Sequence, residues 1–132
     1  MTPSSTIIIG IICIATLVVV GLWRAMRRRG LSGQHRALIQ RLWAQALSEK
    51  HDAMKVMQCD AVLAKALTLL GFTGSLGEML KKSGPRFSDV NAVWSAHKLR
   101  NVIAHETSAS HNASEIQRAI RSFERALHDL GM

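Results

Sequence analysis

Residues 7–23 read IIIGIICIATLVVVGLW, an uncharged apolar run that determines how the rest of the chain can be arranged. Seventeen residues rising 1.5 Å each make about 26 Å of helix, which is near the shortest length that crosses a bilayer. A cleaved signal peptide is the main alternative. It would carry basic residues before the run and a small-residue cleavage site after it, and this chain has neither. We therefore expect an uncleaved transmembrane helix at 7–23.

The charges that flank this run predict its orientation. Residues 1–6 are uncharged, whereas four arginines follow the run: Arg24, Arg27, Arg28 and Arg29. The positive-inside rule then places residues 1–6 outside and the remainder in the cytoplasm, at the inner membrane of the cell. Trp23 fits an interfacial anchor. The arginines could instead bind nucleic acid, but topology and attraction to anionic lipid headgroups are a sufficient explanation for them. We expect residues 24–33 to form a basic juxtamembrane linker, with 30–33 as a short flexible joint.

The composition of the remaining chain sets limits on its partners. The formal charge is +8, from 17 Lys and Arg against nine Asp and Glu. Once the four flanking arginines are set aside, the folded part is only mildly basic, which permits a nucleic-acid partner without requiring one. Cys13 and Cys59 lie on opposite sides of the arginine cluster, so we expect two free thiols and no metal knuckle.

Residues 34–132 are predicted to fold as an all-α bundle. Apolar residues recur every three to four positions from Gln34, over 52–70 and after Asn112 or Ser114, either of which could cap the last helix. The glycine-rich stretch 71–77 is a helix stop rather than a phosphate loop, because no strand precedes it and no Gly-Lys-Ser/Thr follows. A short helix is expected at 76–82. A long helix is expected from a Ser88 cap to His105; since it is apolar on two sides, we expect it to be the central one.

Asp60 interrupts the apolar stripe of the 52–70 helix. A buried carboxylate is costly unless it is paired, so Asp60 either faces a cation or donors on a neighbouring helix, or sits at the wet edge of a wide stripe.

The densest group of potentially chemical side chains lies in 97–106. His97, Asn101 and His105 follow at i, i+4 and i+8 and share one stripe, while Arg100 lies about 140° from His105 on an ideal helix. Guanidinium, carboxamide and imidazole together suit an anion. Two alternatives remain. The polar groups could simply bond to one another, or His97, His105, Glu106 and His111 could bind metal; the H-E-x-x-H motif, however, fails at Ala109. We expect no metal and no cofactor.

Residues 99–106, LRNVIAHE, resemble the R-x4-6-H signature of the HEPN superfamily in its Arg-Asn form. The chain from about residue 34 to 131 also resembles bacterial proteins with one N-terminal membrane helix and this domain. The resemblance implies a four- to five-helix bundle that forms a homodimer with two motifs facing each other. It also implies that Arg100 and His105 carry metal-independent RNA cleavage, with Asn101 orienting phosphate or imidazole and His97 and Asp60 in support.

Two functions remain open. The first is a membrane-tethered endoribonuclease in which two protomers each supply one His105, because a single imidazole cannot easily serve as base and acid at once. The second is a noncatalytic interaction or ligand-sensing bundle. Many HEPN-like domains are of this kind, and the chain has no Tyr and few aromatic side chains on which RNA bases could stack.

Overall fold

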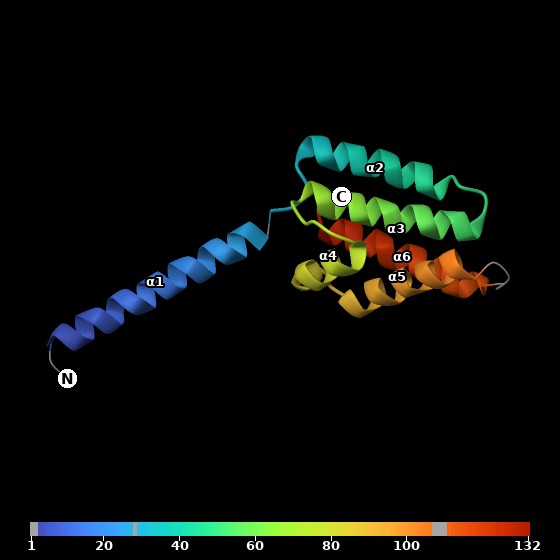
Figure 1. The fold of residues 1–132 in the computed structure, drawn as a ribbon. Helices are drawn as coiled ribbons and strands as arrows, with labels where there is room; N and C mark the ends of the chain where they lie inside the picture. Colours follow the sequence, from blue (N-terminus) through green and yellow to red (C-terminus); the bar gives the residue numbers. More distant parts are fainter. Residues whose placement is uncertain (1–2, 28, 107–110) are drawn as a thin grey trace.

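The computed structural model describes residues 3–27, 29–106 and 111–132, and this part of the chain is all-α, with 81% helix and no strand. The first helix, α1 (Pro3–Arg27), projects from a bundle formed by the other helices (Figure 1). These are α2 (Gly33–Leu47), α3 (Asp52–Leu69), α4 (Leu76–Ser83), the 3-10 turn η1 (Gly84–Arg86), α5 (Val90–His105) and α6 (Ala113–Asp129). The predicted all-α fold with an N-terminal apolar helix is confirmed.

Helix α1 carries the apolar run. Over Pro3–Ala25 it is long and apolar enough to cross a membrane, and no other helix in the described part of the chain meets that test. Its large aliphatic side chains are exposed and its terminal Trp23 is 49% exposed, so the bundle does not cover this surface. The helix runs from Pro3 to Arg27, so it extends beyond the predicted 7–23 at both ends and includes the start of the predicted linker 24–33. Arg28 lies outside the described residues.

The stretch predicted as a flexible joint is instead packed, and that prediction was wrong. Leu31 is 4% exposed, and its backbone N–H donates to the carbonyl of Leu130 at 2.9 Å. Nearby, Arg36 Nε donates to the carbonyl of Gly131 at 2.6 Å. Gly131 has φ +99°, a conformation that glycine adopts without a steric penalty. We call these contacts between residues 30–36 and 130–131 the terminal clasp.

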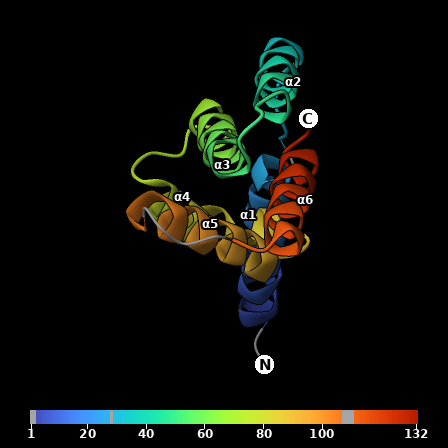
Figure 2. The same cartoon turned by 90° about the vertical axis from the view of Figure 1, so that its right-hand side faces the viewer.

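Helix α3 is the central helix of the bundle, in place of the predicted 88–105 helix. Figure 2 shows α3 between α2 on one side and α4 and α5 on the other, and it also contacts α6. The buried residues of α3 cover an arc of about 160° on an ideal helix. In α5, only Val93 and Ala96 are fully buried. The two apolar sides of α5 therefore contain partly exposed residues, because α5 packs at the surface between α3 and α6.

Glycines and capping residues determine where the helices on either side of the loops end and begin. Gly71 and Gly74 have φ +95° and +104°, as expected for a helix stop, and Ser75 and Glu78 form a capping box that starts α4. The cap of α5 is Asp89, which accepts from the Ala92 N–H, and not Ser88 as predicted. Ser88 instead donates from its N–H and hydroxyl to Asp129 at the end of α6.

The final helix follows its sequence pattern. Asn112 caps α6 by accepting from the Ser114 N–H, which decides between the two predicted caps. The predicted apolar stripe is buried in full: Ile116, Ala119, Ile120, Phe123, Leu127 and Leu130. Residues 107–110, which precede α6 in the sequence, lie outside the described residues.

Candidate functional site

Helices α3 and α5 bring four polar side chains into one closed ring. His97 Nδ1 lies 2.7 Å from Asp60 Oδ1, and Asn101 Nδ2 lies 3.4 Å from His97 Nε2. Arg100 Nη1 donates to Asn101 Oδ1 at 3.1 Å, and Arg100 Nε lies 3.5 Å from Asp60 Oδ2. We call these four residues the Asp60 ring.

Asp60 is the buried member of this ring. It is 6% exposed, so it sits inside the apolar stripe of α3 rather than at a wet edge. Two donors of α5 face its carboxylate, one on each oxygen. This is the arrangement expected for a carboxylate that could not be buried without partners.

The ring has a consistent direction of hydrogen bonding. An ionised carboxylate only accepts, so His97 Nδ1 carries the proton that Asp60 receives. His97 Nε2 can then accept from the Asn101 amide, whose oxygen accepts in turn from Arg100. Each group thus donates to the next in the order Arg100, Asn101, His97, Asp60.

Only one edge of the Arg100 guanidinium faces other residues of the ring. Its side chain is 33% exposed, and its Nε is buried without a hydrogen bond, since 3.5 Å to Asp60 is long for one. A guanidinium has five N–H groups, and here two of them point at Asp60 and Asn101. The others have no hydrogen-bond partner among the residues that the structure describes, so Arg100 keeps donors for an anion.

His105 lies outside the ring. It is the last residue of α5 and is exposed, and its side chain has no hydrogen bond or ion pair within the described ranges. Asn101 bonds Arg100 and His97, and Asp60 holds the same two side chains. The structure therefore joins four of the five predicted site residues and leaves His105 separate, one turn beyond Asn101.

Two neighbours complete the surroundings of the ring. Trp94 meets His97 edge to face, with ring centroids 6.1 Å apart. Gly77 of α4 lies against the same pair: a Cβ placed there would be 3.8 Å from Trp94 and 3.9 Å from His97 Nε2. The sequence pattern did not predict the contact of Trp94 with His97. Its i, i+3 spacing from His97 was the available signal.

Cys59, the neighbour of Asp60 in the chain, is a poor nucleophile. It is fully buried, and burial raises the pKa of its thiol to about 12. The positive charge of Lys55 opposes this increase, and the negative charges of Asp60 and Glu124 raise the pKa by smaller amounts. Because the thiolate is the reactive form, Cys59 is part of the core and not of the site.

The proposed metal ligands do not gather. Within the described ranges, no three His, Cys, Asp or Glu side chains come close enough to hold a metal ion. His97 is committed to Asp60, whereas His105 and Glu106 are exposed.

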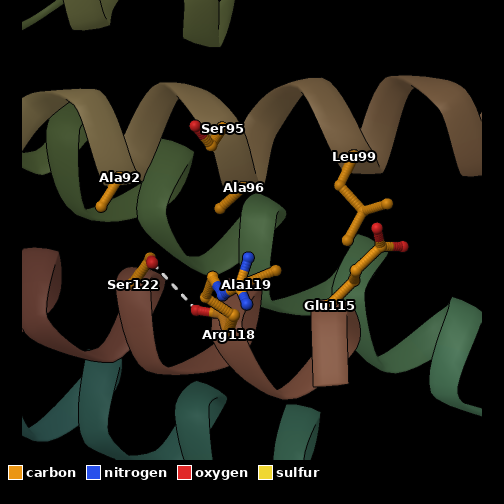
Figure 3. A pocket seen from close by; sticks show the side chains of 8 residues that line it. All are labelled: Ala92, Ser95, Ala96, Leu99, Glu115, Arg118, Ala119 and Ser122. Atoms are coloured by element: carbon orange, nitrogen blue, oxygen red, sulfur yellow. Dashed lines mark hydrogen bonds between the residues drawn. The ribbon is translucent and has the colours of Figure 1, made fainter. Parts of the chain in front are cut away.

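An open groove lies on another face of α5 and contains none of the ring residues. It has a volume of about 280 Å³, runs between α5 and α6, and is lined by Ala92, Ser95, Ala96, Leu99, Glu115, Arg118, Ala119 and Ser122 (Figure 3). Most of these side chains are small. Glu115 and Arg118 are its only charged lining groups among the described residues, and the hydroxyls of Ser95 and Ser122 each donate to a backbone carbonyl of their own helix.

Comparisons with protein-family models, with curated proteins and with solved structures found no match. The candidate site is therefore defined by geometry: a partly exposed arginine paired with a buried carboxylate, and a separate exposed histidine at the end of the same helix.

Proposed function

We propose that this chain is a membrane-anchored, HEPN-like endoribonuclease that acts as a homodimer without a metal ion. The proposal joins the resemblance of residues 99–106 to the HEPN signature with the geometry of the Asp60 ring. The proposal rests on one observation, the different environments of Arg100 and His105 on α5. Arg100 is oriented by Asp60 and Asn101 yet keeps donors, while His105 is exposed and unbound among the described residues.

These residues suit attack of an RNA 2′-hydroxyl on the adjacent phosphate. One imidazole removes the proton from the 2′-oxygen as it bonds to phosphorus, and a second delivers a proton to the departing 5′-oxygen. Arg100 stabilises the negative charge that develops on the phosphoryl oxygens. Each protomer supplies one His105, so the reaction requires two copies of α5 to meet.

We place the bundle in the cytoplasm. Arg24 and Arg29 follow the apolar part of α1, with two further arginines between them in the sequence, whereas residues 1–6 carry no charge. The positive-inside rule then puts the bundle on the cytoplasmic side of the inner membrane, where RNA is present.

The test uses the full chain in neutral detergent with Arg100→Ala and His105→Ala variants. Both should lose cleavage of single-stranded RNA by at least about 100-fold, and chelators should not affect the wild type. His105→Ala should leave the free energy of unfolding within about 0.5 kcal/mol, because the side chain is exposed and unbonded. His51→Ala, another exposed histidine, is the matched control and should cleave normally. Equal cleavage by wild type and both site variants would end the catalytic assignment.

One observation favours the second function, a noncatalytic bundle. The four ring residues satisfy much of one another's bonding within a single protomer, as a purely structural network would. On that account no variant and no wild-type preparation cleaves RNA, and Arg100→Ala lowers stability while His105→Ala does not. The pair of variants therefore separates the two functions, since only catalysis makes His105 matter.

A further inference from the structure

The end of the bundle that faces α1 is rich in positive charge. Helix α4 and η1 lie at this end, next to the linker that follows α1 (Figure 1). Its basic side chains form what we call the basic collar: Arg29, Arg36, Lys81, Lys82 and Arg86. The terminal clasp adjoins it, and Arg29 is the last of the four arginines that follow the membrane run in the sequence.

The collar is fixed in place relative to the linker. Arg86 Nη1 donates to the carbonyl of Arg29 at 3.1 Å, and the Arg86 guanidinium lies 5.5 Å from the centre of the Phe72 ring. On the other side of the linker, Leu31 is buried against the end of α6 and Arg36 holds the carbonyl of Gly131. These contacts keep this end of the bundle directed at the membrane that α1 would span.

The acidic side chains at this end are occupied by helix ends. Glu78 accepts from the Ser75 N–H at 2.7 Å, Asp89 accepts from the Ala92 N–H at 3.0 Å, and Asp129 binds Ser88. In contrast, Lys81 and Lys82 make no hydrogen bond or ion pair to any residue that the structure describes. They interact electrostatically with Glu78, and their exposed ammonium groups keep hydrogen-bond donors for an external partner.

The opposite end of the bundle has a different balance. Around the α2–α3 turn, Lys50 and Lys55 are offset by Glu49 and Asp52. The ends of α5 and α6 at that side add Glu106 and Glu115. In the segments named here, basic side chains outnumber acidic ones at the end that faces α1, whereas acidic side chains outnumber basic ones at the opposite end.

We propose that the basic collar docks the bundle onto anionic lipid headgroups of the membrane crossed by α1. A basic surface within a Debye length of an anionic membrane is attracted to it, and here the anchor and the clasp already supply the proximity. Because α5 begins at the collar and ends at His105, fifteen residue steps away, docking holds His105 about 22 Å along the helix from the membrane-facing end. Docking of this kind goes beyond the proposed function and does not depend on catalysis.

The test measures how close each end of the bundle lies to the headgroups in the full chain. Cys13→Ala removes the thiol in α1, and Cys59 is buried, so a single introduced cysteine can carry a fluorophore. Thr73→Cys labels the collar end and His51→Cys the far end; both positions are exposed. Energy transfer to acceptor-labelled headgroups is then compared in nanodiscs of phosphatidylcholine alone and of phosphatidylcholine with phosphatidylglycerol.

Anionic lipid should increase transfer from the collar label and decrease it from the far label. The double substitution Lys81→Gln with Lys82→Gln should lower the ratio of docked to undocked bundle by about 30-fold. Each lysine near an anionic surface increases that ratio by a factor of about five to six. Lys50→Gln with Lys55→Gln removes the same charge at the far end and should change nothing.

Three results would overturn the proposal. Transfer from the collar label could be the same in both lipids, or the two lysine pairs could have equal effects. The third is that the collar lysine variant loses binding of single-stranded RNA while its distance to the headgroups is unchanged, which would assign the collar to RNA.

Discussion

Replacing Asp60 by Asn tests whether the Asp60 ring stabilises the fold. The substitution keeps the size and one acceptor oxygen of the side chain but removes its charge. The carboxamide oxygen that Asp60→Asn introduces can still accept from His97 Nδ1, now through a neutral bond, whereas the attraction to Arg100 is lost. Because the Asp60 side chain is only 8% exposed, water cannot replace the missing charge.

The expected loss can be worked from these contacts. The 2.7 Å bond between His97 and Asp60 is short and involves a charged acceptor, and weakening such a bond costs about 1.5–2 kcal/mol. The Arg100 contact is longer, at 3.5 Å, and Arg100 is one-third exposed, so it adds less than about 1 kcal/mol. We expect the free energy of unfolding to fall by about 2–3 kcal/mol, or roughly 10–20 °C in the melting temperature for a bundle of this size.

Denaturant unfolding of the full chain in neutral detergent, followed by far-ultraviolet circular dichroism, measures this loss. Asp52→Asn is the matched control, since Asp52 lies in the first turn of the same helix but is exposed. It should cost only about 0.3–1 kcal/mol through the helix dipole. A double-mutant cycle with His97→Ala should return a coupling between Asp60 and His97 of about 1–2 kcal/mol.

A loss of under about 0.5 kcal/mol for Asp60→Asn would refute the reasoning, since surface substitutions commonly have effects of that size. So would a coupling energy near zero, because then Asp60 and His97 would not stabilise one another despite their short contact.

Three further predictions concern other parts of the bundle. In a chain with Cys13→Ala, Cys59 should resist maleimide at neutral pH until the bundle unfolds, because it is buried and its pKa is raised to about 12; rapid labelling of this variant in its native state would contradict the prediction. Gly131→Ala should lower stability by about 1–2 kcal/mol, since a Cβ would be strained at φ +99° and would lie 3.1 Å from Leu31 N; an unchanged melting curve would show that the terminal clasp is not tight. The pKa of Glu78 is lowered, chiefly by the hydrogen bond from the Ser75 N–H, so Glu78 stabilises the fold above its ordinary pKa and this contribution is lost as acid protonates it. Glu78→Gln should therefore remove part of the acid sensitivity seen in a pH series of unfolding curves, and an identical pH profile would contradict the capping role.

Local patterns predicted the helices well. Apolar spacing alone located the stripe of α6, because its buried residues follow one narrow face and its polar residues occupy the other. The glycines after α3 predicted a stop for an equally local reason, since two of them adopt positive φ values that other residues avoid.

Features that depend on distant partners were not predictable in this way. Ser88 and Asp89 were equally good caps by residue type, and the choice depends on Asp129, which engages Ser88 from the end of α6. Leu31 resembled part of a loose joint because nothing nearby in the sequence contacts it; its partner is Leu130, at the other end of the chain. The central position of α3 likewise depends on which helices surround it and not on its own pattern.

The candidate site also combines features that local sequence patterns predicted with features that depend on distant partners. Its two histidines on α5 have different roles. Helical spacing placed His97, Asn101 and His105 on one stripe, and the misfit of Asp60 in an apolar stripe indicated that it needs a partner. The position along α5 at which α3 packs against it then determines that Asp60 contacts His97 rather than His105. A substitution at His97 therefore disturbs the fold whether or not the protein is an enzyme, because it opens the ring that orients Arg100. His105 makes no hydrogen bond or ion pair within the described part of the chain, so a loss of RNA cleavage in His105→Ala with unchanged stability, RNA binding and dimerisation would indicate chemistry at that imidazole.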